Sequence, residues 1–503
     1  MSTPVNPPSG SRGLSQPARE RAVTLLTAIG TLMVAVDSTI VILALPTMAR
    51  DLASPLSTII WTILIYLLIT AALTTQAGKI GDLLGRGRVY NLGFAIFTVG
   101  SALSGFAPTD IFLIVARGIQ AVGGALVFAN GGALIAAVYP PERRGRAFGF
   151  LAFGWGVGAI LGVLLGGVIT TDIGWRYIFF INIPIGIFAA YLGLRSLPKD
   201  TPQKVGFDLP GFVLFSAILS LVCYGLIELA VYGVSILNVS YLVLGGLLLV
   251  PWITLELRSR QPMLNLHQLK NRLLAFSLVA GLFQSLGYLS VVFLLTMYLQ
   301  GLRGLSPLDA SLLLVPGYLI GALLAPVMGR SVDQRGARTF ATLGILCMGA
   351  AVLGYSLLDL SSWLGFIPMI SLVSGIGTGM FYPANTTAIM SQATPSTFGA
   401  ISGVRTTLMN LGTLLSFVLA LTIASASIPR AVAYEVFLGT TNLVGGLSSA
   451  FLTGIHAALW GSAAILLVAA LLSWSRGREV SKVAPAVIST TAPAEPAPLA
   501  DGK

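Results

Sequence analysis

Residues 78–88 read Gly-Lys-Ile-Gly-Asp-Leu-Leu-Gly-Arg-Gly-Arg, and residues 329–338 read Gly-Arg-Ser-Val-Asp-Gln-Arg-Gly-Ala-Arg. Both stretches fit G-x-x-x-D-x-x-G-x-x-R or a close variant, and each lies between two apolar segments. A loop that recurs at corresponding places in the two halves of a chain indicates two homologous bundles, here of six helices each. Two further helices are then left over between the bundles.

Fourteen apolar segments, each about long enough to cross a bilayer, surround these loops. Of the 503 residues, 55% are hydrophobic and only 9% are charged, whereas a soluble domain carries about 25% charged residues. A helical crossing needs about 20 mostly apolar residues. We predict spans at residues 22–46, 57–77, 88–107, 111–138, 147–170, 176–197, 209–231, 237–257, 273–299, 308–329, 338–358, 364–390, 398–424 and 453–474.

The segments are rich in Leu, Ile, Val, Ala and Gly without sustained alternation, which favours helices over a β-barrel. We therefore predict an all-α membrane protein with an N-terminal six-helix bundle (22–197), two inserted helices (209–257) and a C-terminal six-helix bundle (272–474). Residues 1–20 and 479–503 are rich in Pro, Ala, Ser and Thr, and we expect them to be disordered tails.

The net charge of +11 is distributed unevenly along the chain. If the N-terminus lies inside, nearly all Lys and Arg residues fall in inner loops and tails. The outer loops hold only Arg50, Arg176, Arg303 and Arg430. This asymmetry follows the positive-inside rule. It predicts a multi-pass protein of the cell membrane with both termini in the cytoplasm, and we expect no nucleic-acid partner.

Two charges fall deep within predicted spans. Asp37 lies about 22 Å from the inner side of the first span, and Arg117 lies about 20 Å from it in the fourth, at a rise of ~1.5 Å per residue. At nearly the same level they can neutralise each other, and protonation of Asp37 would free Arg117. The alternative is a static ion pair that only joins two helices.

Four stretches resemble the major facilitator superfamily, in its fourteen-helix drug:proton antiporter branch. They are the segments Val36–Pro46, Gly78–Arg88, Arg117–Ala125 and Gly174–Gly186. The first contains Asp37 and Thr39, and the last contains Trp175-Arg176 and Asn182-Ile-Pro184. The chain departs from the family pattern at Ile42, Leu83 and Val163, where Asn, Arg and Pro are usual. Val163 is the most consequential, because the missing proline belongs to the antiporter motif of the fifth span.

The resemblance implies proton-coupled efflux of lipophilic, drug-like or cationic compounds by alternating access between the two bundles. No ATP-binding loop of the G-x-x-x-x-G-K-[ST] type is present, so we expect the proton gradient to supply the energy and no cofactor to be needed. The expected partners are the lipid bilayer, small lipophilic substrates and protons, and we expect a monomer. There are three alternatives. The first is an exporter of one specific metabolite, antibiotic or lipid, and the others are a channel and an intramembrane enzyme. An enzyme is disfavoured by the two isolated histidines.

Family analogy also assigns candidate site residues. Gln120 and Phe128 share the face of Arg117 by helical spacing, and the resemblance places this face on a central cavity. The opposite wall would be formed by Gln284, Tyr288, Phe381, Tyr382, Asn385 and Arg405. Ordinary packing is the alternative for each aromatic residue.

Three further sets of residues carry hypotheses of their own. Arg405 either reaches toward Asp82 to close the cytoplasmic side or meets an anionic substrate group. Glu228 is either an interfacial carboxylate or a second proton site. The expected cytoplasmic gate consists of Gly78, Asp82, Gly85, Arg86 and Asp333, with the three glycines of the first loop, Gly81 included, allowing a tight reversal.

Glycines also recur at every fourth position of two spans. They are Gly154, Gly158, Gly162 and Gly166 in the fifth span, and Gly317 and Gly321 in the tenth. Such small-residue ridges allow close helix contact. We expect these two spans to slide against each other at the seam between the bundles, and ordinary tight packing is the alternative. The outer segment 425–452 is either a partial helix or a lid.

Overall fold

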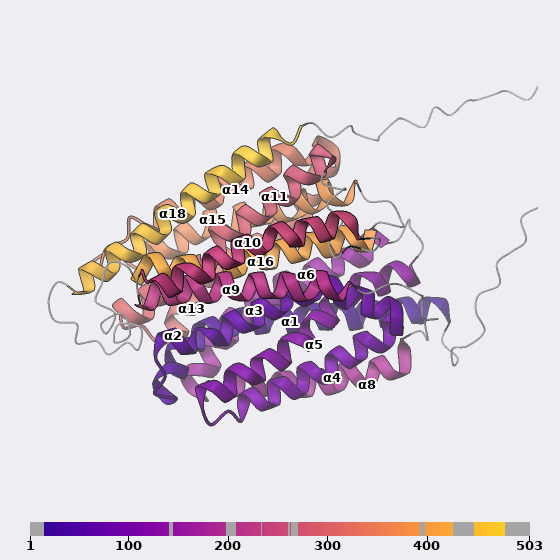
Figure 1. The fold of residues 1–503 in the computed structure, drawn as a ribbon, viewed down its shortest axis with the longest axis horizontal. Coiled ribbons are helices and arrows are strands. Elements are labelled where there is room, and N and C mark those ends of the chain that lie inside the picture. The colour runs from indigo at the N-terminus through magenta and orange to yellow at the C-terminus, as the bar shows by residue number, and fades with distance from the viewer. Residues whose placement is uncertain are drawn as a thin grey trace, which may run out of the picture.

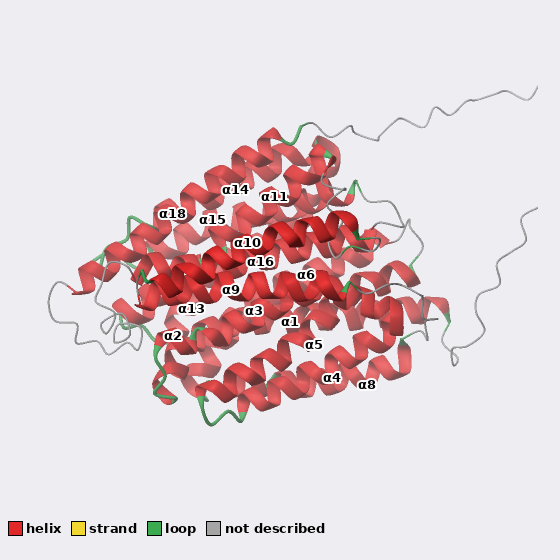
Figure 2. Cartoon of the chain, viewed as in Figure 1, coloured by secondary structure: helices red, strands yellow, loops and turns green. Residues whose placement is uncertain are grey.

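A computed structural model describes residues 15–139, 144–197, 208–232, 234–259, 262, 270–392, 398–425 and 447–477. Within these ranges the regular structure is entirely helical (Figure 2). Helices suit apolar segments of this length because they satisfy every backbone polar group internally. The all-helical character predicted from the sequence is therefore confirmed for the described residues.

The helices run side by side along the long axis of the molecule (Figure 1). In chain order they are α1 (Gln16–Asp51), α2 (Leu56–Ile59), α3 (Trp61–Leu84), α4 (Arg86–Gly105), α5 (Asp110–Val138), α6 (Arg144–Asp172), α7 (Tyr177–Phe180), α8 (Asn182–Ser196), α9 (Leu209–Tyr232), α10 (Ile236–Arg258), α11 (Arg272–Tyr288), α12 (Val291–Thr296), the π-helix η3 (Met297–Leu302), α13 (Pro307–Arg335), α14 (Ala337–Tyr355), α15 (Phe366–Met390), α16 (Phe398–Ser425) and α18 (Leu447–Ser475). We call the end at which α1 begins the proximal end, and the opposite end the distal end.

Twelve helices in the described ranges are long and apolar enough to cross a membrane, or thirteen if the bent pair Trp61–Thr74 and Gln76–Leu84 is one span. The helix α4 coincides with the third predicted span but is not among them. Its glycines and serines make it less apolar than its neighbours. By the length and composition of the described helices, twelve or thirteen of the fourteen predicted spans are recognised.

Side-chain caps begin several of these helices. The hydroxyl groups of Thr109, Ser235 and Ser306 accept hydrogen bonds from backbone amides three residues later. Such caps satisfy donors that the first helical turn leaves open. The helix α1 begins at Gln16, so the end of the tail expected over residues 1–20 is helical. A proline in the first turn favours this start, because its ring fixes a helical φ.

The N bundle, formed by α1–α8, and the C bundle, formed by α11–α18, are built on the same pattern. In the N bundle, the extensive contacts are α1 with α6, α3 with α5, α4 with α5, and α4 with α8. In the C bundle, α11 packs on α16, α13 on α15, α14 on α15, and α14 on α18. Each pair in one bundle has its counterpart in the other, as the repeated loop at α3–α4 and α13–α14 predicts.

The two bundles meet along two seams. At one seam α6 packs on α13, and at the other α3 packs on α16. Of the inserted pair, α9 lies against α3 and α16, and α10 packs on α9 (Figure 1). An apolar cluster shared by α3, α9, α10, α11, α15 and α16 includes Phe215 stacked on Trp252. The inserted pair therefore covers the α3–α16 seam.

The glycine ridges differ from expectation, because they face the interior of their own bundles. On α6, added Cβ atoms at Gly154, Gly158, Gly162 and Gly166 would meet α1. On α13, those at Gly317 and Gly321 would meet α15. The α6–α13 seam instead uses another face of α6, where Gly156 lies beside Ala322. A ridge every fourth residue shows that a helix has a tightly packed face but not which neighbour fills it.

Candidate functional site

The carboxylate of Asp37 sits at the centre of a buried polar network. Asp37 is fully buried, and Arg117 is 2% exposed. Arg117 Nη1 donates to Asp37 Oδ2 at 2.7 Å, and Gln120 Nε2 donates to Asp37 Oδ1 at 2.8 Å. Asn182 Nδ2 also approaches Asp37 Oδ1, at 3.4 Å. Helices α1, α5 and α8 thus supply one site.

Arg117 has further contacts that do not involve Asp37. Its Nε donates to the carbonyl oxygen of Thr62 at 3.1 Å, and its Nη1 donates to Gln120 Oε1 at 2.7 Å. The guanidinium also lies 4.4 Å from the centre of the Tyr66 ring, where a cation is attracted to the aromatic face. None of these three contacts depends on the charge of Asp37.

Sequence reasoning brought Asp37, Arg117 and Gln120 together but missed the other members of the network. Asn182 donates to Ser101 Oγ at 3.1 Å, and Ser101 donates to the carbonyl oxygen of Phe179 at 2.8 Å. A signal for Asn182 existed, because an amide within an apolar span needs a polar partner. Tyr66 carried no comparable signal.

The remaining candidate of the N bundle, Phe128, packs against α6 and does not take part in this network. Its ring is 5.8 Å from that of Trp155 on α6 in an edge-to-face arrangement. Glu228, the second expected proton site, lies near the distal end of α9. Its carbonyl oxygen accepts a hydrogen bond from Asn238 of α10 at 3.3 Å. This contact places Glu228 in the inserted pair, away from the α1, α5 and α8 elements that surround Asp37.

Four of the candidates in the C bundle come from three of its helices. Gln284 of α11 is fully buried, and Tyr288 of α11 shares a hydrogen bond with Ser374 of α15. Tyr382 of α15 and Arg405 of α16 are near enough to interact electrostatically. The structure thus gathers Gln284, Tyr288, Tyr382 and Arg405 on one side of the C bundle.

The other two candidates of the C bundle differ from expectation. Phe381 is 1% exposed and packs against α14 at Gly344. Adjacent residues of a helix point in directions about 100° apart, so Phe381 and Tyr382 cannot share a face. Asn385 is buried within the bundle, where its Oδ1 accepts a hydrogen bond from Arg476 Nη1 at 3.4 Å. Both residues belong to the interior of the C bundle.

The expected gate residues lie at the proximal end. Asp82 and Arg86 form an ion pair of 2.7 Å across the junction of α3 and α4, and Arg86 also approaches the carbonyl oxygen of Ala133 on α5. Arg405 was an alternative partner for Asp82. The structure places it beside Tyr382 instead. Asp82 and Arg86 therefore tie the α3–α4 junction to α5.

The repeated loops also share a backbone conformation. Gly85 has φ of 97°, and Gly336 has φ of 84°. These values fall in the left-handed region that favours glycine, so both junctions need it. Gly81 approaches Asn130 of α5 closely, whereas a Cβ at Gly78 would meet open space. Of these two glycines, only Gly81 is required by close packing. Asp333 lies in α13, and its side chain falls outside the described structure.

A second group of charges joins the inserted pair to the N bundle. Lys79, within the first repeated loop, donates to the carbonyl oxygen of Pro262 at 3.0 Å and is attracted by Asp208 and Glu256. Both carboxylates are buried. A Cβ on Gly211 would lie 2.5 Å from Asp208 Oδ2 and 2.9 Å from Glu256 Oε1, so the two acids converge. Sequence reasoning missed them because they lie at span ends.

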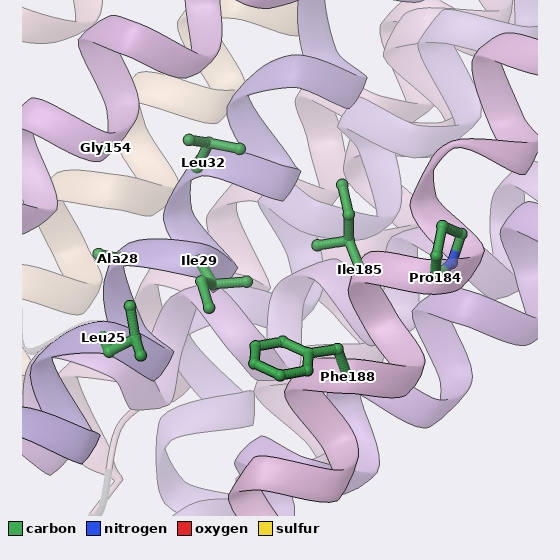
Figure 3. A pocket seen from close by; sticks show the side chains of 8 residues that line it. All are labelled: Leu25, Ala28, Ile29, Leu32, Gly154, Pro184, Ile185 and Phe188. Atoms are coloured by element: carbon green, nitrogen blue, oxygen red, sulfur yellow. The ribbon is translucent and has the colours of Figure 1, made fainter.

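An apolar groove of about 620 Å³ lies between α1, α6 and α8 (Figure 3). Its lining is Leu25, Ala28, Ile29, Leu32, Gly154, Pro184, Ile185 and Phe188. Leu25 and Phe188 are exposed on the outer surface of the N bundle. The groove contains no charged side chain and is separate from the Asp37 network.

Comparisons with known proteins agree with this architecture. The model of the Major Facilitator Superfamily matches residues 27–417. The chain is 31% identical over 457 residues to the riboflavin transporter RibZ of Clostridioides difficile, which covers 90% of this chain and 96% of that protein. It is 30% identical over 411 residues to the tetracenomycin C resistance and export protein of Streptomyces glaucescens, covering 81% and 75% of the two chains.

Among solved structures, the fold resembles a bacterial homolog of the human lysosomal transporter Spinster, in an inward-facing and unoccupied conformation. The TM-score is 0.62 at 14% identity, and the alignment covers 93% of this chain and 98% of that chain. At this identity the likeness concerns the fold alone. The family match, the two relatives and the fold agree on one type of membrane protein.

Proposed function

Because this chain belongs to the Major Facilitator Superfamily, we propose that it is a proton-coupled exporter of lipophilic, drug-like compounds. It is a multi-pass membrane transporter by family. The single observation that carries the proposed coupling is the fully buried Asp37, paired with Arg117 at 2.7 Å. A carboxylate inside a membrane protein is costly and is typically retained for function.

The proposed switch uses the two sets of contacts around Arg117. Protonation of Asp37 removes the charge attraction, and Arg117 then depends on Thr62, Gln120 and the ring of Tyr66. A buried charge without its counterion costs several kcal/mol. The protonated state therefore favours a rearrangement of α1 against α5 that lets water or substrate reach Arg117. This rearrangement couples proton entry to alternating access.

The bundles are proposed to rock about the two seams while the proximal loops open and close. The Asp82–Arg86 pair holds the α3–α4 junction to α5, which suits a gate. The contacts between bundles at the distal end include Gln300 Nε2 donating to the carbonyl oxygen of Leu43 at 3.2 Å. This supports a distal side that is closed in the present conformation.

The topology is part of the proposal. Fourteen crossings with both termini in the cytoplasm would place the basic residues of both repeated loops inside, as the positive-inside rule requires. In a variant without Cys223 and Cys347, a membrane-impermeant maleimide should label Ser361→Cys in intact cells and Ser15→Cys only after permeabilisation. The reverse pattern would contradict this orientation.

Transport measured in everted membrane vesicles tests the coupling. A panel of lipophilic fluorophores that are cationic, neutral or anionic should include members that the vesicles accumulate when energised. We expect a protonophore or Asp37→Asn to abolish accumulation. The exposed Asp309 provides the control, because Asp309→Asn removes a carboxylate without touching the buried network. Accumulation that survives both the protonophore and Asp37→Asn would overturn the proton switch.

A transporter of one specific metabolite or antibiotic is the second candidate. It is favoured by the 31% identity to a riboflavin transporter over 90% of this chain, and by the identity to a tetracenomycin C exporter. In that case the protein should transport none of the fluorophores in the panel and should transport a single natural compound. Accumulation of several unrelated fluorophores would exclude this narrow specificity.

A further inference from the structure

Three tyrosines and one arginine converge from four helices of the C bundle. Tyr288 lies on α11, Tyr318 on α13, Tyr382 on α15 and Arg405 on α16. The phenol groups of the tyrosines are close enough to interact electrostatically with one another, and Arg405 is close enough to interact with Tyr382. All four residues are only partly buried, although they lie among several helices. Each of the four residues therefore has surface that a small molecule can contact.

Two buried polar atoms in this group have no hydrogen-bond partner among the described residues. They are Arg405 Nε, which is a donor, and Gln284 Oε1, which is an acceptor. Gln284 is fully buried, and its Nε2 is 3.5 Å from the sulfur of Met348. Buried polar atoms are nearly always satisfied by protein, water or a ligand. Both atoms therefore point to a polar group that binds here.

The charges around this group are not balanced. Asp37 and Arg117 neutralise each other in the N bundle, and the ion pairs of the described residues do not include Arg405. The surrounding phenol groups and the guanidinium offer hydrogen-bond donors, with no carboxylate among them. A donor-rich, positive site attracts an anionic or acceptor-rich group and repels a cation.

We propose that Arg405 binds an anionic group of the exported substrate, such as a carboxylate, sulfonate or enolate, while Tyr288, Tyr318 and Tyr382 hold its aromatic body. Gln284 Oε1 accepts a hydrogen bond from the same molecule. This inference rests on the proposed function and adds the substrate class, an aromatic amphiphile with an acidic group. Arg405 is then the residue that decides specificity by charge.

Equilibrium binding to the purified full-length protein in zwitterionic lipid nanodiscs tests the charge preference. The probes are pyrene-butyrate, its methyl ester and pyrene-butylamine, which share a ring system and differ in charge. We expect the carboxylate to bind most tightly. Arg405→Gln should weaken carboxylate binding about tenfold, since a hydrogen bond to a charged group is lost. Binding of the ester should be unchanged, and Arg405→Lys should keep part of the preference.

The control is Arg303→Gln, because Arg303 lies at the distal end and bonds to Tyr298 and Ser362. Equal weakening of acid and ester by Arg405→Gln would show a structural role and overturn the proposal. So would the absence of a preference for the carboxylate, or the absence of binding by all three probes. A lipid headgroup offers the same anionic chemistry. If anionic lipid displaced the carboxylate probe as effectively as unlabelled pyrene-butyrate does, Arg405 would be assigned to lipid instead of substrate.

This experiment is separate from proton coupling. Binding needs no gradient, so it can succeed where Asp37→Asn leaves transport intact, and it can fail where coupling is demonstrated. A preference for the carboxylate that depends on Arg405 supports the substrate class whatever the outcome of the vesicle assay.

Discussion

Asp37 accepts hydrogen bonds from Arg117, Gln120 and Asn182, and Gln120 also accepts from Arg117. A single amide thus bridges both members of the ion pair. A buried hydrogen-bond network of this kind favours one geometry, while loss of one charge leaves the other without its counterion in a low-dielectric interior. At the scale of the residue, the site is both rigid and sensitive to one proton.

A double-mutant comparison separates a switch from a static pair. Asp37→Asn and Arg117→Gln should each destabilise the protein by about 3–5 kcal/mol, because each leaves an uncompensated buried charge. The double variant should regain most of this stability, measured by thermal unfolding in detergent. Its transport should remain absent if Asp37 carries the proton.

The exposed pair Arg176–Asp51, at 3.7 Å, serves as the control, since surface pairs contribute at most about 1 kcal/mol. Transport restored in the buried double variant would mean that the ion pair only joins α1 to α5.

At the scale of the element, two faces of α6 contact different helices. The glycines from Gly154 to Gly166 pack on α1, whereas Gly156 lies at the seam with α13. A Cβ at Gly158 would lie 2.7 Å from Ala35 Cβ and 2.8 Å from the carbonyl oxygen of Leu32. A Cβ at Gly156 would lie 3.4 Å from Ala322 Cβ. The inward face is tight at Gly158, whereas the seam face has room at Gly156 and is tight again at Gly167, beside Leu308 and Ser311.

The matched pair of alanine substitutions on α6 tests this difference. Gly158→Ala should destabilise the protein by about 1–3 kcal/mol, because overpacking forces backbone shifts. Gly156→Ala should be neutral or slightly stabilising, because alanine favours the helix. Thermal unfolding of the purified variants measures both. Equal losses would mean that the seam is as tightly packed as the interior.

The inserted pair α9–α10 is fastened to the N bundle by Lys79, Asp208 and Glu256. Glu256→Gln should weaken this attachment and increase hydrogen exchange at the proximal ends of α9 and α10. Asp172→Asn, which changes an exposed carboxylate at the distal end of α6, should leave the exchange of α9 and α10 unchanged. Unaltered exchange in Glu256→Gln would show that the apolar cluster alone holds the pair.

At the scale of the whole molecule, the two seams are unequal. Within the described residues, α9 packs on both helices of the α3–α16 seam and α10 packs on α9, whereas neither helix packs to a similar extent on α6 or α13. Distal contacts between the bundles include the backbone amide of Leu308, which donates to Thr171 Oγ1 at 3.3 Å. Rocking of the bundles would have to break such contacts.

A cross-link between the bundles at the distal end tests the rocking motion. In a variant without Cys223 and Cys347, oxidation of Thr171→Cys with Leu308→Cys should stop transport, and reduction should restore it. The control pair is Ser290→Cys with Ser416→Cys, whose hydroxyl groups are 2.8 Å apart within the C bundle. Transport that continues in the cross-linked distal pair would contradict rigid-body rocking.

The sequence by itself determined the membrane class, the positions of the helical segments, the repeated loops and the common depth of Asp37 and Arg117. These follow from hydropathy, spacing along the chain and the fixed rise of a helix. The tertiary structure alone decided that the glycine ridges face inward, that Phe381 and Asn385 are interior, and that Asp208 and Glu256 converge near Lys79. In lipid, apolar residues suit the core and the outer surface equally, so the sequence pattern does not fix how each helix is rotated about its axis.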